Sequence, residues 1–178
     1  ISCSLVGSEM CIRDRYAEPM VGGGALFFSV LSRYNFEKLY NSDINPELIN
    51  AYVAIRDDVE ALIQKLNDLQ MTFLPMDLNG RKYFYYNIRE KFNALSLSKE
   101  TFVEKAAYFI FLNKTCFNGL YRVNRKGLFN VPMGSYKNPL ICDTDNLRNI
   151  HTALQNVTIV CGDYTQSKAF IDKNTFVY

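Results

Sequence analysis

The chain has 178 residues, a hydrophobic fraction of 48% and a net charge of +2, enough for one domain with a core or for one domain carrying a sizeable insertion. Its five cysteines are odd in number and form no C-x-x-C pair, which argues against a disulfide framework or zinc site and fits a reducing cytoplasm. A single histidine argues against an imidazole metal site, and no apolar run reaches the length of a membrane span.

The first part of the chain predicts alternating strands and helices. Strands are expected over residues 16–21 and 36–41, and apolar residues at helix spacing predict helices over 25–34 and 46–66. A run of three glycines separates the first strand from the first helix. This order is typical of the start of a doubly wound α/β sheet.

The middle of the chain has a different pattern. We expect a turn at 77–80, helices over 83–94 and 101–113, and a loop or twisted hairpin over 118–138, where glycines and a proline interrupt the pattern. A helix over 146–155 and strands over 157–160 and 174–178 then return to the α/β pattern.

These elements predict a Rossmann-like α/β sheet interrupted by a mainly helical insertion. The expected boundaries are 16–70 for the first part of the sheet domain, 71–149 for the insertion and 150–178 for the rest of the sheet domain. Residues 1–15 show no periodicity and no signal-peptide order, and we expect them to be a non-native segment.

The glycine turn is a candidate ligand site. Glycines allow a ligand to approach the backbone closely, and the helix that follows offers amide donors to an anionic group. Asp43 lies nineteen residues beyond Gly24, where such folds place an acid that accepts hydrogen bonds from ribose hydroxyls. Phe27 replaces the third glycine of a dinucleotide fingerprint, which favours another nucleoside cofactor such as S-adenosylmethionine. A tight turn that binds nothing, and a helix-capping role for Asp43, are the alternatives.

Residues 105–142 contain no acid and six basic side chains, so subtracting these six charges from +2 leaves the rest of the chain at −4. Aromatic residues are interleaved with the basic ones, as in surfaces that neutralise phosphates and stack on bases. Tyr108, Phe109 and Phe111 are expected in the core, whereas residues 117–122 are expected to expose apolar groups beside a base. Arg122 is the best candidate to recognise a guanine edge. The alternative is a solvated basic face over an ordinary aromatic core.

Four segments in order resemble the Dam-type DNA adenine-N6 methyltransferases, and the likeness covers nearly all of residues 16–178. Residues 113–134, NKTCFNGLYRVNRKGLFNVPMG, resemble the family signature. Residues 18–25, EPMVGGGA, and 42–45, SDIN, resemble its first two cofactor motifs, and residues 162–164, GDY, resemble the segment that holds the cofactor's adenine. Met20 stands where the family often has Phe.

The resemblance implies roles for individual residues. Gly22 and Gly24 would lie against the methionine part of S-adenosylmethionine, Asp43 would hold the ribose, and Ile44 would contact the adenine. Asp163 would accept from the adenine amino group and Tyr164 would pack on its ring. The complete set of implied cofactor-binding residues is Glu18, Pro19, Met20, Gly22, Gly24, Asp43, Ile44, Asp163 and Tyr164.

The partner that the resemblance implies is double-stranded DNA. Phe117 and Asn118 match positions that enter the duplex beside a flipped base, Leu120 and Arg122 match positions that contact target bases, and Pro132 matches a further DNA contact. The complete implied set is Phe117, Asn118, Leu120, Arg122, Asn124, Arg125, Lys126 and Pro132. A flipped adenine, commonly within GATC, would then receive the methyl group. The full-length form is expected to be a cytoplasmic monomer.

The family's Asp-Pro-Pro-Tyr tetrapeptide, whose carboxylate and carbonyl activate the adenine amine, is expected directly after Tyr178. We therefore expect no catalytic residue within the chain as given, and no turnover by it. Two other interpretations remain open from the residues alone. A non-catalytic DNA-binding remnant fits equally well, whereas an NAD-dependent oxidoreductase fits the glycine turn and Asp43 but leaves the basic segment unexplained.

Overall fold

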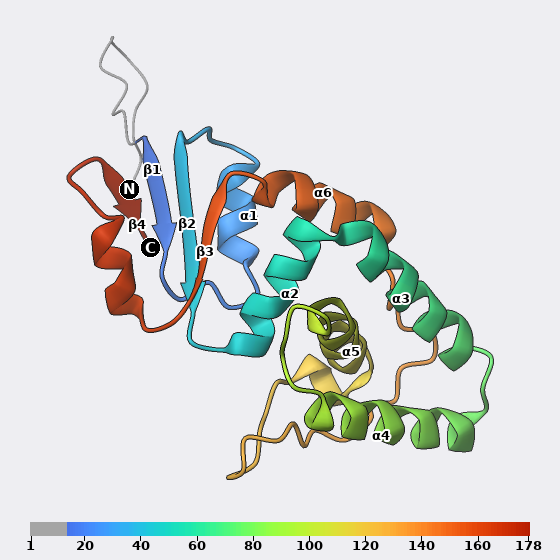
Figure 1. The fold of residues 1–178 in the computed structure, drawn as a ribbon. Coiled ribbons are helices and arrows are strands. Elements are labelled where there is room, and N and C mark those ends of the chain that lie inside the picture. Colours follow the sequence, from blue (N-terminus) through green and yellow to red (C-terminus); the bar gives the residue numbers. More distant parts are fainter. Residues whose placement is uncertain (1–13) are drawn as a thin grey trace. The chain divides into compact units, whose positions relative to one another are not determined.

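A four-stranded sheet forms the first of two structural units. The computed structural model describes residues 14–178, and its strands are β1 (Arg15–Glu18), β2 (Lys38–Asp43), β3 (Val157–Cys161) and β4 (Thr175–Val177). All neighbouring strands are parallel, in the order β3-β2-β1-β4 (Figure 1). This sheet confirms the predicted α/β class with a Rossmann-like sheet. The prediction for residues 1–15 lies outside the described residues, except for Asp14 and Arg15.

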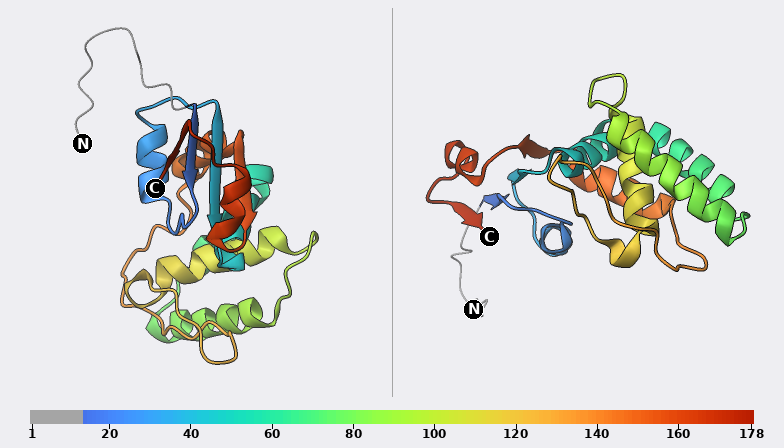
Figure 2. Two further views of the ribbon diagram at one scale, coloured as in Figure 1. Left: turned by 90° about the vertical axis from the view of Figure 1, so that its left-hand side faces the viewer. Right: turned by 90° about the horizontal axis from the view of Figure 1, so that it is seen from below.

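Helical segments cover both faces of this sheet. The helix α1 (Ala25–Leu31) lies on one face and the 3-10 segment η2 (Tyr164–Ala169) on the other (Figure 2). Tyr16 of β1 is fully buried and stacks on Phe27 of α1, with ring centroids 5.7 Å apart. On the opposite face, the ring of Tyr40 lies 5.2 Å from that of Phe170. Aromatic packing on both faces explains why a sheet of such short strands has a core.

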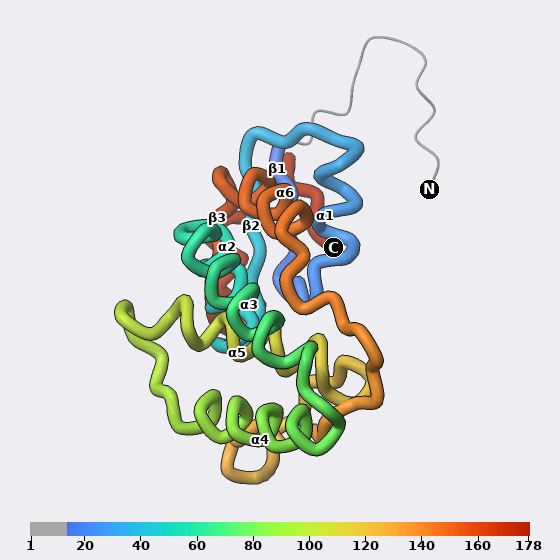
Figure 3. Tube along the Cα trace, turned by 90° about the vertical axis from the view of Figure 1, so that its right-hand side faces the viewer, coloured from blue at the N-terminus to red at the C-terminus, as the bar shows by residue number. Residues whose placement is uncertain are grey.

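The second unit, residues 47–155, is mainly helical, and the first unit comprises the chain up to residue 46 together with residues 156–178. Three rings at its centre, Phe73, Phe84 and Phe111, lie 5.3 to 6.2 Å apart. The helices that run through it, traced in Figure 3, are α2 (Pro46–Asp57), α3 (Val59–Phe73), α4 (Leu78–Ala94), α5 (Phe102–Thr115) and α6 (Thr144–Leu154).

Two helix predictions were wrong in detail, and a capping aspartate explains each. The single helix expected over 46–66 is divided into α2 and α3 at Asp58, whose carboxylate accepts from the Ala61 amide at 3.4 Å. The turn expected at 77–80 is the beginning of α4, where Asp77 accepts from the Gly80 amide at 2.8 Å. An aspartate that satisfies a free amide at a helix start is favoured over continuing the preceding structure.

The strand predictions were correct in type and shifted in position. The first strand ends at Glu18, because Pro19 has no amide to continue the ladder. The second strand begins at Lys38 and runs to Asp43, so it extends past the predicted end at Asn41 to include Ser42, a polar residue that is fully buried. Hydrophobic patterning ended this strand too early, because its last residues are polar and interior.

Residues 117–134 form most of the loop or twisted hairpin predicted over 118–138. The loop begins with the short 3-10 segment η1 (Phe117–Gly119), and isolated antiparallel bridges pair Cys116 with Met133 and Val123 with Phe129. Figures 1 and 3 show this loop beside α4. Across residues 14–178 the helices are all too short or too polar to cross a bilayer.

Candidate functional site

The sheet topology points to a ligand site at the carboxyl end of β1. The chain passes from β1 to β2 to β3 in one direction across the sheet, and β4 then pairs with the opposite side of β1. Ligands of open α/β sheets bind outside the carboxyl ends of the strands at such a reversal of strand order. The glycine turn lies directly after β1, so the topology brings the predicted motif to this position.

The glycine turn and Asp43 are in direct contact. The Gly22 amide donates to Oδ2 of Asp43 at 3.1 Å, and the Asn45 amide donates to Oδ1 at 2.9 Å. Gly22 and Gly24 have φ of 50° and 72°, a region that glycine adopts readily, and Gly24 is the N-cap residue of α1. Ser42, to which the sequence assigned no role, donates from its hydroxyl to the Pro19 carbonyl at 3.0 Å. Two adjacent strand ends are thus tied into one rigid turn.

The remaining predicted cofactor residues lie around this turn. Met20 and Ile44 are each 75% exposed, which is unusual for apolar side chains and leaves them available to a ligand. The Gly162 amide donates to the Asp43 carbonyl at 3.0 Å, which places Asp163 and Tyr164 at the same edge of the sheet. Tyr164 is 57% exposed, and the Asp163 carboxylate accepts from the Thr165 amide at 2.9 Å. That bond lowers the pKa of Asp163.

Glu18 is a buried acid beneath the glycine turn. It is 4% exposed, and its Oε2 accepts from the Tyr16 hydroxyl at 2.7 Å. Burial raises the pKa of the Glu18 carboxyl, and the Tyr16 hydrogen bond opposes this shift. Burial, together with the nearby Glu18 carboxylate, raises the pKa of Tyr16. Asn41, the residue paired with Glu18 on β2, is fully buried, and among the described residues its side-chain amide has no partner.

The residues predicted to contact DNA gather on the 117–134 loop. Phe117 is 52% exposed and Leu120 48%, so the loop presents apolar groups to solvent as expected. Asn118 between them has φ 53°, a left-handed conformation that is uncommon outside glycine and is often found at functional sites. The Pro132 carbonyl accepts from the Phe117 amide at 2.9 Å, which fixes the two ends of the loop together.

The basic residues occupy the far part of the same loop. Arg122 donates from Nε to Oδ1 of Asn130 at 2.9 Å, so its guanidinium is held across the hairpin. At the tip, Oδ1 of Asn124 accepts from the amides of Lys126 and Leu128 at 2.8 and 3.1 Å. All of the predicted DNA-contacting side chains that carry charge are exposed: Arg122, Arg125 and Lys126. The loop therefore offers a held guanidinium beside exposed apolar groups.

Comparison with known proteins identifies the family of this chain. The sequence matches the description "D12 class N6 adenine-specific DNA methyltransferase" over residues 8–178. The chain belongs to this family. It is 49% identical over 164 residues to the type II methyltransferase M.MjaIII of Methanocaldococcus jannaschii, covering 92% of this chain and 56% of that protein. It is 38% identical over 161 residues to a DNA adenine methylase of Haemophilus influenzae, covering 90% of this chain and 52% of that protein. The chain spans about half the length of these relatives.

Family membership confirms the resemblance found in the sequence and favours the methyltransferase interpretation over the oxidoreductase one.

One element of the sequence interpretation needs correction. Lys105 was counted among the basic residues facing DNA, but it is 6% exposed and donates from Nζ to the carbonyls of Phe92 and Leu95 at 2.6 and 2.9 Å. Desolvation lowers its pKa. Lys105 ties α4 to α5 and does not belong to the surface. Of the three aromatic residues expected in the core, Phe111 is fully buried, whereas Tyr108 and Phe109 are half-buried.

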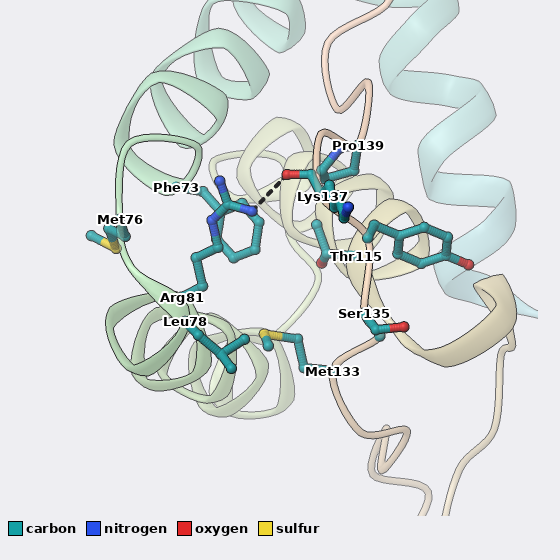
Figure 4. A pocket seen from close by; sticks show the side chains of 11 residues that line it. Phe73, Met76, Leu78, Arg81, Thr115, Met133, Ser135, Lys137 and Pro139 are labelled. Atoms are coloured by element: carbon teal, nitrogen blue, oxygen red, sulfur yellow. Dashed lines mark hydrogen bonds between the residues drawn. The ribbon is translucent and has the colours of Figure 1, made fainter.

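A cavity of about 310 Å³ lies beside the 117–134 loop (Figure 4). Arg81 crosses one wall, stacks over Phe73 and donates to the Lys137 carbonyl at 2.7 Å and to the Leu74 carbonyl. The guanidinium thus holds the segment that follows the loop.

Residues 14–178 contain no group of three or more His, Cys, Asp or Glu side chains placed to bind a metal ion.

The buried Glu18 predicts a pH dependence of stability. A carboxyl whose folded pKa lies above its unfolded value, near 4.5, stabilises the fold below that value, and this contribution is lost as pH rises through the folded pKa. Glu18→Gln cannot titrate, so we expect its melting temperature to fall less between pH 5 and pH 8 than that of the wild type. Parallel melting curves for the two proteins across this range would contradict the assignment.

Proposed function

We propose that this protein is a site-specific DNA methyltransferase that transfers a methyl group from S-adenosylmethionine to N6 of adenine in double-stranded DNA, within GATC. The observation that carries the proposal is the contact between the Gly22 amide and the Asp43 carboxylate at the carboxyl edge of a parallel sheet, in a chain of this family. The relatives named adenine methylases support the choice of base.

The cofactor proposal assigns each group at the edge a partner on S-adenosylmethionine. The backbone of Gly22 and Gly24 lies against its methionine part, and Asp43 accepts from the ribose hydroxyls. Exposed Ile44 and Tyr164 contact the adenine, whose amino group donates to Asp163. The remaining members of the proposed site, which shape or border the turn, are Glu18, Pro19 and Met20.

The DNA proposal assigns the loop to the duplex. Phe117 and Asn118 enter the stack beside the flipped base, and Leu120 and Arg122 contact target bases. The residues proposed to complete the surface are Asn124, Arg125, Lys126 and Pro132. The unit formed by residues 47–155, which contains the insertion expected over 71–149, is thus the proposed reading unit, and the sheet unit is the proposed cofactor unit.

The chemistry that this arrangement serves is direct transfer to a poor nucleophile. The lone pair of the exocyclic nitrogen of adenine is delocalised into the ring, which makes the nitrogen a poor nucleophile. Positioning and electrostatic stabilisation must therefore supply most of the rate. The residues of this chain contribute by holding the sulfonium cofactor and the extruded base. We propose that the 178 residues alone bind both ligands without turnover, and that the full-length protein is a monomer.

Ligand binding tests this function directly. S-adenosylhomocysteine, the demethylated product, is expected to raise the melting temperature of the chain, whereas NAD is expected to leave it unchanged, because only a ligand of the native state stabilises it. A shift with NAD alone would favour the oxidoreductase. DNA binding without any response to S-adenosylhomocysteine would favour a non-catalytic DNA-binding protein.

A further inference from the structure

One face of α4 is bonded to the backbone of the 117–134 loop. Tyr85, Arg89 and Asn93 are spaced four residues apart and therefore share a helix face. The Tyr85 hydroxyl donates to the Val131 carbonyl at 2.9 Å, and Nη1 of Arg89 donates to the same carbonyl at 3.3 Å. Asn93 donates from Nδ2 to the Phe129 carbonyl at 3.0 Å and accepts at Oδ1 from the Phe129 amide at 2.8 Å.

Asn93 satisfies both backbone groups of Phe129 at once. This reciprocal pair is the pattern that a neighbouring β-strand would supply. In the described part of the chain, the strand pairing within the loop is limited to two isolated bridges, Cys116–Met133 and Val123–Phe129. Phe129 is 4% exposed, so its amide and carbonyl need protein partners. The side chain of Asn93 therefore makes the two hydrogen bonds that a neighbouring strand would make to Phe129.

The anchored residue is one position from the partner of Arg122. Phe129 pairs with Val123, and the next residue, Asn130, donates from its amide to the Arg122 carbonyl at 3.1 Å and accepts from Arg122 Nε at 2.9 Å. Two hydrogen bonds through Asn130 thus link the position of Phe129 to Arg122. No motif in the sequence marked Asn93, which lies near the end of a helix.

We propose that Asn93 is a positioning residue for DNA discrimination: through Phe129 and Asn130 it sets where Arg122 lies, without itself touching DNA. This inference rests on the proposed function, since it concerns how the loop reads a duplex. In this proposal α4 holds the 117–134 loop in position, whereas cofactor binding belongs to the sheet unit.

The test compares Asn93→Asp with Asn79→Asp, which makes the same chemical change at an exposed position of the same helix. Asn93→Asp removes the donor to the Phe129 carbonyl and places a carboxylate against it. Dissociation constants are measured for a duplex with one GATC and for a duplex of the same composition without it. We expect Asn93→Asp to lose about tenfold in this ratio, the size of one misplaced base contact, and Asn79→Asp to keep the wild-type ratio. S-adenosylhomocysteine binding is expected to be unchanged in both variants.

Tryptic cleavage gives a readout that does not depend on DNA. Arg125 and Lys126 are exposed at the loop tip, so loosening of the loop is expected to speed cleavage there several-fold in Asn93→Asp. A wild-type binding ratio in Asn93→Asp would overturn the inference, whatever the cleavage rate. If the wild type itself does not discriminate between the duplexes while cleavage is faster in the variant, the proposed DNA function fails, although Asn93 still holds the loop. Should Asn93→Asp not fold, Tyr85→Phe, which removes only the hydroxyl bonded to Val131, is put through the same two measurements.

Discussion

Replacing Asp43 with asparagine is expected to weaken the binding of S-adenosylhomocysteine roughly 100-fold. The carboxylate accepts from the amides of Gly22 and Asn45 at 3.1 and 2.9 Å, and in the proposed site it also accepts from the ribose. An amide has one acceptor atom and brings a donor, so it cannot serve both backbone amides. A hydrogen bond to a charged acceptor contributes about 1.5–3 kcal/mol, and the variant loses at least one with the ligand, whereas the bond lost within the turn lowers the stability of the fold.

The measurement for Asp43→Asn is isothermal titration with S-adenosylhomocysteine. Asp68→Asn is the matched control, because it makes the same change at an exposed position on α3 in the other unit. Equal affinities for Asp43→Asn and Asp68→Asn would remove Asp43 from the cofactor site. A lower melting temperature for Asp43→Asn without ligand is also expected, since its carboxylate ties the turn after β1 to the end of β2.

Local chemistry explains why the contact between the glycine turn and Asp43 was predictable from the sequence. A glycine run between a strand and a helix, and an acid at the end of the next strand, are properties of short segments, and a parallel sheet brings strand ends to one edge. The contact between Gly22 and Asp43 follows from these rules alone. The hydrogen bond from Ser42 to the Pro19 carbonyl does not, because Ser42 is a buried polar residue within a strand and lies just beyond the strand end that the hydrophobic pattern predicted.

The 117–134 loop was predictable only in part. Its composition indicated exposed apolar groups beside basic ones, as Phe117 and Arg122 show. Which side chains hold the loop depends on contacts between residues about 40 apart, such as Asn93 with Phe129. Charge counting likewise misplaced Lys105. The sequence alone does not distinguish an exposed lysine from one that is buried and donates to two carbonyls inside a helical unit.

Arg122 carries the second large expected effect. Arg122→Ala is expected to lower the preference for the GATC duplex by about 10- to 100-fold, the range of one bidentate contact to a guanine edge. The side chain is exposed, yet Asn130 holds Nε at 2.9 Å and its carbonyl lies 3.4 Å from Nη2. A guanidinium already fixed in the free protein loses less rotamer freedom on binding, so more of the contact energy is available for discrimination.

Two companion variants separate recognition from charge. Arg122→Lys keeps the positive charge but loses the planar fork, so we expect it to retain DNA affinity and lose most of the preference. Lys126→Ala, at the exposed tip, is expected to weaken binding to both duplexes equally and to reduce the dependence of log K on log salt by about one. If Arg122→Ala behaves like Lys126→Ala instead, Arg122 contacts phosphate, and the base-reading role must be sought among the other exposed residues of the loop, Leu120 first, whose side chain is 48% exposed.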